Sequence, residues 1–209
     1  MVILVSIIKR FVKFQFFIVF FTSASISRAD PYSLENLSEY LTNLKFLKAD
    51  FLQVNADGSE SSGSILMKRP GRMRFEYDEP DNTLVLIAAG ALAIFDPKGD
   101  QDPITYPVRN NPISLLLNSK IDLINSGIVS DYREGLEEAV LLIRDPITPE
   151  SGSVELLFSG AEPELKKFTV KNENGTSTSI ALENTEYPNN INDTLFSIAL
   201  EINKRKDSD

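Results

Sequence analysis

The sequence predicts a mainly β protein with a few helices (α+β), built on a single curled antiparallel sheet. From residue 47 onward, apolar and polar residues alternate in short runs, which is the period of a strand with one buried face. Clusters of Gly, Pro, Asn and Asp separate these runs at short intervals, as in a meander of antiparallel strands. Helical spacing is confined to a few segments, so strands are expected to dominate the fold.

Residues 1–29 are predicted to be a secretory signal that is cleaved before Asp30. Basic residues lead into a strongly apolar stretch at 14–21, and small residues stand at positions −3 and −1 from the cleavage point. An uncleaved anchor is the alternative, but Lys13 limits the apolar run to fewer than the ~20 residues that a spanning helix needs. Since no linker or repeat divides them, residues 30–209 are expected to form one domain.

An amphipathic helix is predicted over residues 33–44. Its leucines follow one another at spacings of three and four, which places them on one face, and Ser33 is positioned to cap the helix. Residues 112–118 and 121–126 are the other helical candidates. Because a curled sheet has an apolar interior to cover, these helices are its natural covers.

The strands follow in order along the rest of the chain. A strand beginning at Leu47 ends at a turn over 55–58, and a hairpin joins 65–68 to 73–77. In the hairpin turn, Pro70 fixes one φ angle and Gly71 supplies a positive φ. Further strands are expected near 83–88, 91–96, 101–107, 128–134, 139–144, 153–158, 165–171 and 177–183, with a last short strand near 195–200.

The residue types that are missing exclude several classes of chemistry. The chain has no His and no Cys, which excludes Ser-His-Asp and Cys-His sites and metal sites that need imidazole or thiolate. Paired acids at 78–79 and 137–138 leave a two-carboxylate glycosidase as a remaining enzyme hypothesis, although acids beside Pro80 commonly form a solvated turn. We therefore expect a protein that is not an enzyme and that needs no cofactor and no metal.

The charge balance is strongly acidic. The formal net charge is −9, and removal of residues 1–29 leaves 17 Lys and Arg against 30 Asp and Glu. Nucleic acid is therefore an unsuitable ligand, whereas a partner with a basic surface is compatible with this charge. Simple solubility is the alternative explanation. Without Cys the chain also lacks the residue that lipoprotein acylation requires.

The stretch GSILMKRPGRMRFEYDEP at 63–80 resembles the hairpin of the periplasmic outer-membrane lipoprotein carrier family, and residues 68–80 follow that family's run most closely. Shorter similarities follow in order at 84–88, 90–97, 111–117, 152–159, 165–170 and 195–198. The resemblance implies an unclosed half-barrel of about eleven strands, with lid helices over a cavity for acyl chains. The chain departs from the family at Phe75, where Trp is common, and in its charged tail at 200–209.

The resemblance also implies a latch. In this family the Arg of the Arg-Pro motif donates hydrogen bonds to backbone carbonyls of the lid and keeps the empty cavity shut, and Arg69 matches it. The alternative is a turn arginine that points into solvent. The expected lid residues are Leu34, Leu37, Leu41, Leu44, Ile113 and Leu116. The expected cavity residues, for which ordinary core packing is the alternative, are Met73, Phe75, Tyr77, Leu84, Leu86, Leu92, Ile94 and Phe95.

The function implied by the resemblance is that of a soluble, monomeric periplasmic carrier. It would shield the acyl chains of lipoproteins and shuttle them from the inner to the outer membrane. The implied partners are acylated lipoprotein clients, an inner-membrane release complex and, in some lineages, an outer-membrane receptor. A secreted lipid-binding or envelope-biogenesis module that carries free lipid is the alternative function.

Overall fold

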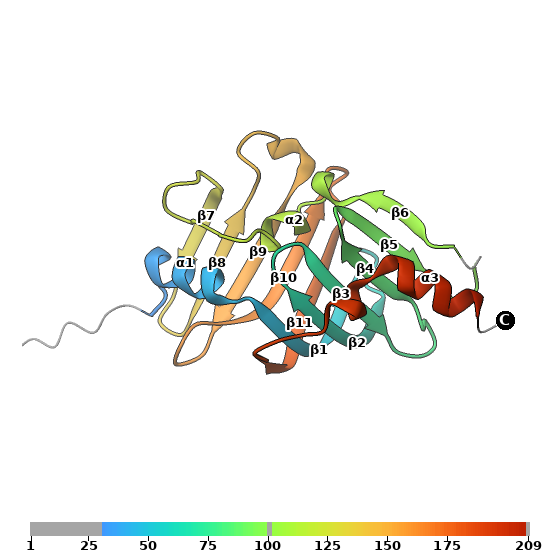
Figure 1. The fold of residues 1–209 in the computed structure, drawn as a ribbon. Coiled ribbons are helices and arrows are strands. Elements are labelled where there is room, and N and C mark those ends of the chain that lie inside the picture. Colours follow the sequence, from blue (N-terminus) through green and yellow to red (C-terminus); the bar gives the residue numbers. More distant parts are fainter. Residues whose placement is uncertain (1–30, 100–101, 208–209) are drawn as a thin grey trace, which may run out of the picture.

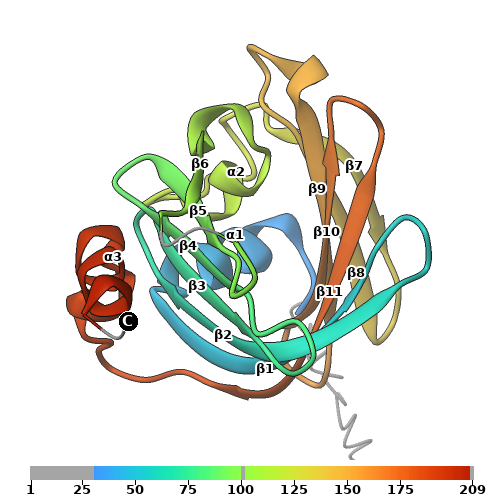
Figure 2. The ribbon, with the colours of Figure 1, turned by 90° about the vertical axis from the view of Figure 1, so that its right-hand side faces the viewer.

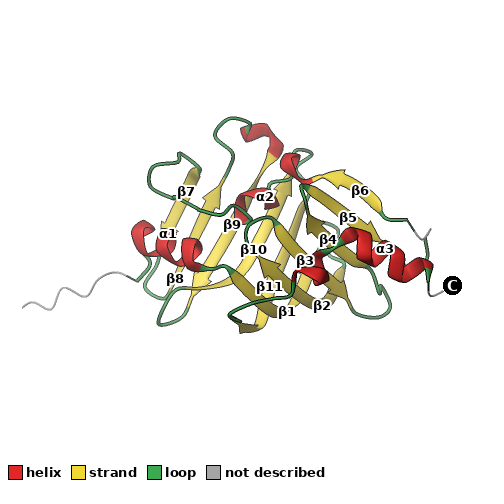
Figure 3. Cartoon of the chain, viewed as in Figure 1, coloured by secondary structure: helices red, strands yellow, loops and turns green. Residues whose placement is uncertain are grey.

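The sheet is curled but does not close on itself. The computed structural model describes residues 31–99 and 102–207, so the signal predicted at 1–29 lies outside the described residues. One 11-stranded antiparallel sheet runs in the order β6-β5-β4-β3-β2-β1-β11-β10-β9-β8-β7. Figures 1 and 3 show it bent around a concave face, with β6 and β7 at its two edges. The predicted fold class, an unclosed half-barrel of about eleven strands, is confirmed.

Two meanders join at the centre of the sheet, where β1 pairs with β11. The first meander contains β1 (Phe46–Val54), β2 (Glu60–Lys68), β3 (Arg72–Tyr77), β4 (Leu84–Ala88), β5 (Ala91–Phe95) and β6 (Ile104–Pro107). The second contains β7 (Val129–Glu134), β8 (Glu138–Ile143), β9 (Gly152–Ser159), β10 (Glu164–Asn172) and β11 (Ser177–Glu186). The chain between β6 and β7 must therefore cross from one edge of the sheet to the other.

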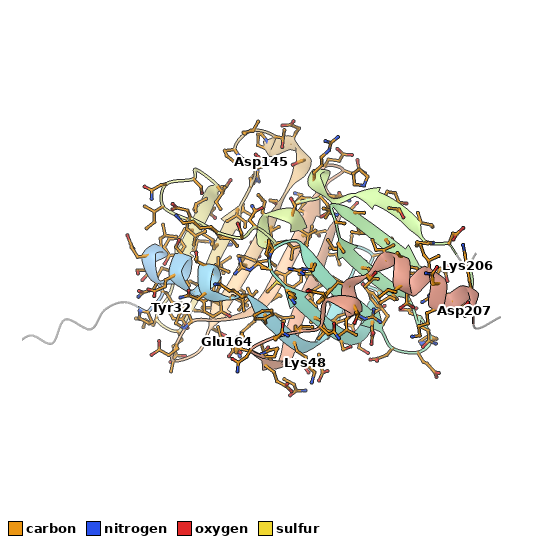
Figure 4. The ribbon with its side chains drawn as sticks, in the orientation of Figure 1. Tyr32, Lys48, Asp145, Glu164, Lys206 and Asp207 are labelled. Atoms are coloured by element: carbon orange, nitrogen blue, oxygen red, sulfur yellow. The ribbon has the colours of Figure 1, made fainter. Side chains whose placement is uncertain are left out.

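Two helices lie inside the curve of the sheet and one lies outside it. Figure 2 shows α1 (Leu34–Asn43) and α2 (Ile113–Leu116) on the concave side, and α3 (Ile198–Lys206) on the convex side. Short 3₁₀ turns complete the chain as η1 (Val108–Asn110), η2 (Pro149–Ser151) and η3 (Asp193–Phe196). Figure 4 shows Tyr32, just before α1, and Lys206, in the last turn of α3, at opposite ends of the molecule. Among the described residues, no helix is long and apolar enough to cross a bilayer.

The predicted strand near 195–200 is wrong, because this segment forms η3 and α3. The Ser197 hydroxyl caps α3 by accepting a hydrogen bond from the backbone amide of Leu200. The last turn is basic, which is favourable at the negative end of a helix. Ile198 and Ile202, four residues apart, pack on the convex face of the sheet. The apolar residues that suggested a strand therefore belong to a helix, whose spacing of four places Ile198 and Ile202 against the sheet.

Two smaller expectations also need correction. Residues 121–126 form turns instead of a helix, because the Asp122 carboxylate accepts hydrogen bonds from the amides of Ile124 and Asn125. The hairpin turn has the predicted positive φ at Gly71, +72°, but its Arg69–Pro70 peptide bond is cis, which the turn prediction did not include.

Gly63 is required by the close approach of β2 and β3. It faces Tyr77 in the register, and a Cβ atom at this position would lie 2.0 Å from the carbonyl oxygen of Glu76. Gly63→Ala is therefore expected to lower the free energy of unfolding by about 1–3 kcal/mol, the usual cost of overpacking. Urea unfolding followed by circular dichroism would measure this, with Ser64→Ala on the same strand as the control. Equal midpoints for the two variants would contradict the prediction.

Candidate functional site: a latched lid over a concave wall

The helix α1 presents an apolar face to the inside of the sheet. Leu37 and Leu41 are fully buried, Leu44 is nearly so, and Leu34 packs beside them. They share one core with residues of the concave face, including Met73. The four predicted lid leucines, three in α1 and Leu44 just after its end, therefore all pack into the core under the lid.

The crossing segment, defined as residues 108–128 between β6 and β7, supplies the second part of the cover. Its buried apolar residues are Ile113, Leu115, Leu116, Leu117, Ile121 and Leu123. Hydrogen bonds join it to α1, since the Ser38 hydroxyl donates to the Ile121 carbonyl and accepts from the Leu123 amide, each at 3.1 Å. Thr42 donates to the same Ile121 carbonyl at 3.2 Å. We call α1 and the crossing segment together the lid.

Arg69 lies at the point where the two parts of the lid meet the sheet. Its side chain is buried, with the residue only 6% exposed, and its Nε donates to the carbonyl of Leu44 at 2.6 Å. Its Nη1 donates to the carbonyl of Asn118 at 3.3 Å. One guanidinium thus bonds both the end of α1 and the crossing segment, and the exposed turn arginine considered as the alternative is not what the structure contains.

Backbone hydrogen bonds reinforce this junction. The Arg69 amide donates to the carbonyl of Lys45 at 2.8 Å, and the Gly71 amide donates to the carbonyl of Leu117 at 2.9 Å. The hairpin between β2 and β3 is therefore joined to both parts of the lid by main chain as well as by side chain.

The Arg69 guanidinium is charged at this junction, but one of its donor atoms has no hydrogen-bond partner in the part of the chain that the structure describes. Burial lowers the pKa of Arg69 from 12.5 to about 10, so the guanidinium stays charged at neutral pH and its bonds to carbonyls are charge-assisted. Its Nη2 has no hydrogen-bond partner among the described residues. A buried donor without a partner costs on the order of 1–3 kcal/mol, which offsets part of the gain from the other two bonds.

The register divides the predicted cavity residues between the two faces of the sheet. Met73 faces Ile87, and Phe75 faces Val85, in the same layer as the lid leucines. The predicted residues on this concave face are Met73, Phe75, Tyr77, Leu92 and Ile94.

The assignment of Leu84, Leu86 and Phe95 to the cavity is wrong. These three side chains lie on the convex face, where they form a separate core with Ala93 beneath Ile198 and Ile202 of α3. The physical reason is that successive side chains in a strand point to opposite faces of the sheet. The register of each hairpin therefore decides whether the odd-numbered or the even-numbered residues of a strand face inward.

The concave face also contains residues that sequence reasoning missed. Ile104 and Tyr106 of β6 face Ile94 and Leu92 in the register, so they belong to the same wall. They are 57% and 53% exposed, whereas Met73 at the covered end is buried. The wall therefore continues from under the lid onto an open apolar strip at the β6 edge, defined as Leu92, Ile94, Ile104 and Tyr106.

A cluster of aromatic rings lies on the concave wall. Phe51 contacts Phe75 and Tyr77 edge to face, with ring centroids 5.5 and 5.1 Å apart. The Tyr77 hydroxyl donates to the side-chain carbonyl of Gln53 at 2.7 Å. Burial raises the pKa of Tyr77 to about 12, so this hydroxyl stays neutral at physiological pH. Phe51 was not among the predicted residues.

A hollow of about 690 Å³ lies on the outer side of the lid and is not the predicted cavity. Tyr40, Leu44, Phe46 and Tyr187 are among its lining residues, and none of the predicted cavity residues lines it. The Tyr187 hydroxyl, on its border, donates to the carboxylate of Glu164 at 3.2 Å, and Figure 4 shows Glu164 on the lower side of the molecule. The predicted wall residues Met73 and Phe75 are instead packed against the lid.

Comparison with known families agrees with this arrangement. Residues 42–199 match the family of the outer membrane lipoprotein carrier protein LolA. The chain belongs to this family. The match begins within α1 and ends within α3, so it includes every strand of the sheet.

Individual carrier relatives are distant in sequence. An outer-membrane lipoprotein carrier protein of Coxiella burnetii is 31% identical over 114 residues, which are 51% of this chain and 54% of the relative. One of Chromohalobacter salexigens is 23% identical over 182 residues, 83% of this chain and 86% of the relative. The chain thus spans about half the length of the first of these curated relatives and most of the second.

A solved structure supports the fold. A domain of Vibrio parahaemolyticus named for outer membrane lipoprotein sorting superposes with a TM-score of 0.50 at 9% sequence identity. The superposition covers 81% of this chain and 97% of that domain. At this identity the likeness concerns the fold alone.

The hydroxyl of Ser38 should be a main attachment between the two parts of the lid. Ser38→Ala removes the acceptor of the Leu123 amide and one of the two donors to the Ile121 carbonyl, which keeps Thr42, so we expect a loss of about 1–3 kcal/mol in unfolding free energy. Thr42→Val is the control, because it removes a single bond to the same carbonyl. Urea unfolding and amide hydrogen exchange at Leu123 would measure the difference. Equal exchange rates at Leu123 in the two variants would contradict it.

Proposed function

We propose that this chain is a carrier that holds the acyl chains of lipoproteins between its lid and the concave wall of its sheet. The observation that carries the proposal is that one buried arginine, Arg69, holds two apolar lid segments over an apolar wall. Membership of the lipoprotein carrier family supports the same reading. In this proposal the structure is the closed, unloaded state.

The energetics favour an exchange between lid and cargo. Burial of one Leu side chain stabilises by roughly 1.5–3 kcal/mol, so Leu37, Leu41 and Leu44 together contribute about 5–9 kcal/mol. A long acyl chain gains on the order of 10 kcal/mol on leaving water, at ~0.8 kcal/mol per methylene. The two quantities are similar, so cargo can displace the lid leucines from the wall and the lid can later displace the cargo.

The open strip gives cargo a place to begin. Ile104 and Tyr106 present apolar surface on the concave side before the lid moves, and Leu92 and Ile94 continue that surface inward. Phe75 of the aromatic cluster is in the row of paired residues that runs through Val85 and Ile94 to Ile104, so the strip and the cluster belong to one wall. We propose that an acyl chain enters along this wall and that the lid opens as the chain advances.

The wider proposal places the carrier in a cellular route. We infer that residues 1–29 are cleaved, that residues 30–209 act as one domain and a monomer in the periplasm, and that no catalytic step is involved. Lipoproteins would be received from an inner-membrane release complex and delivered to the outer membrane, with or without a receptor there. The acidic surface is compatible with basic docking surfaces on such partners.

Arg69→Leu should make the carrier retain its cargo. Loss of the bonds to Leu44 and Asn118 weakens the closed state that competes with cargo, so loading persists while transfer to outer-membrane vesicles falls, by about ten-fold if the closed state loses ~1.4 kcal/mol. The measurement is the amount of acylated protein that copurifies from the periplasm, identified by mass spectrometry, and its transfer rate.

Arg133→Leu serves as the control, since Arg133 is an exposed arginine on β7 that pairs with the surface acids Asp131 and Glu155. Unaltered transfer by Arg69→Leu would remove Arg69 from the release step. Recovery of free phospholipid without any acylated protein from the unmodified carrier would favour the free-lipid alternative over the proposed cargo.

Ile104→Asp should weaken cargo binding without unfolding the protein. A charge on the exposed strip makes burial of an acyl chain there costly, while the folded state loses little because Ile104 is already exposed. We expect at least a five-fold weaker affinity for a pyrene-labelled fatty acid, corresponding to ~1 kcal/mol. Leu200→Asp on α3 is the matched control, since Leu200 has similar exposure on the convex side. Equal affinities would exclude the strip from the binding surface.

A further inference from the structure

A C-terminal strap, defined as residues 187–206, crosses the convex face of the sheet. Figure 2 shows it passing below the sheet and ending in α3 on the outside. Ile191 and Phe196 are buried against Ala88 in a core of their own, and Ile198 and Ile202 pack over the convex core. The strap is therefore an anchored part of the fold.

One carboxylate of the strap joins both ends of the hairpin that holds Arg69. Asp193 Oδ1 lies 2.6 Å from Lys68 Nζ and also pairs with Arg72 Nη1. Lys68 and Arg72 face each other in the register as the last pair before the turn. Lys68 Nζ also donates to the carbonyl of Ile191 at 2.7 Å, which fixes the ammonium against the strap.

The hairpin needs such a partner because it concentrates positive charge. Lys68, Arg69 and Arg72 lie within five consecutive residues, and Arg69 points to the lid while the other two point to the strap. Like charges at this spacing repel, and Asp193 offsets that repulsion on the convex side. The ion pairs hold the pKa of Asp193 below its usual value, so the carboxylate stays charged at neutral pH.

We propose that Asp193 is a positioning residue of the latch. By joining Lys68 to Arg72 it fixes the ends of β2 and β3, and thereby holds Arg69 where its guanidinium reaches the carbonyls of Leu44 and Asn118. The inference rests on the proposed function for its biological meaning, because a latch matters only if the lid opens. The structural part of the inference can be tested without cargo. It states that the Asp193 carboxylate on the convex face controls the contacts of Arg69 with the lid on the concave face.

The test is amide hydrogen exchange at Gly71, whose amide donates to Leu117 of the lid. Asp193→Asn in the full chain should raise this exchange rate about three- to ten-fold, while Asp193→Glu, which keeps the charge, should restore most of the protection. Glu186→Gln is the matched control. It removes one ion pair from the same face, with Lys48, and the Glu186 side chain is 64% exposed against 66% for Asp193.

A second arm separates positioning from general support. If Asp193 acts through Arg69, Asp193→Asn should have little further effect on Gly71 exchange in an Arg69→Leu background. A full additional effect in that background, or equal exchange in Asp193→Asn and Glu186→Gln, would overturn the inference. Failure of the carrier proposal looks different, since the unmodified protein would then bind no acylated protein while the exchange results could still hold.

Discussion

The closed shape depends on the buried guanidinium of Arg69. An 11-stranded sheet that curls without closing leaves an apolar concave face, and the lid covers that face without adding strands to the sheet. The lid is therefore held mainly by side-chain packing and by the few hydrogen bonds at the hairpin, of which the Arg69 guanidinium makes two. A strand paired into the sheet would be bonded along its whole length, whereas in the proposed mechanism this cover leaves as a unit once that junction opens.

Local patterns were sufficient for features whose cause is local. The leucine spacing of α1, the Pro-Gly turn and the alternation in β3 each reflect the geometry of neighbouring residues, and the strands fall where alternation and turn residues indicate. The side toward which a strand faces is a different matter. Leu86 and Leu92 look equivalent in sequence, but the turn at Gly90 sets a register in which one lies beneath α3 and the other on the concave wall.

Contacts between distant parts of the chain were beyond such reasoning. The strap reaches the hairpin across more than a hundred residues, and the short apolar run at 195–200 suits a strand until the convex core beneath it is known. Ile104 was overlooked for a related reason. A short edge strand gives little periodicity, and its membership of the wall follows only from pairing with Ile94. Strand pairing and burial depend on the tertiary structure. The sequence therefore predicts a covered apolar wall, but not every residue that belongs to it.

The two kinds of contact around the lid suit two different tasks. Apolar packing of the lid, at about 5–9 kcal/mol for three leucines, is of the same size as the gain from burying an acyl chain, which is the balance that the proposed exchange of lid and cargo requires. The polar contacts at the hairpin are smaller and directional, and exposed ion pairs such as those of Asp193 are weakened by solvent screening. Such contacts cannot dominate the affinity for an acyl chain, but they can shift a nearly balanced equilibrium between closed and open lid by several-fold. Because Lys68 and Arg72 connect the convex strap to the Arg69 turn, a change at one face of the sheet has a direct physical path to the lid on the other.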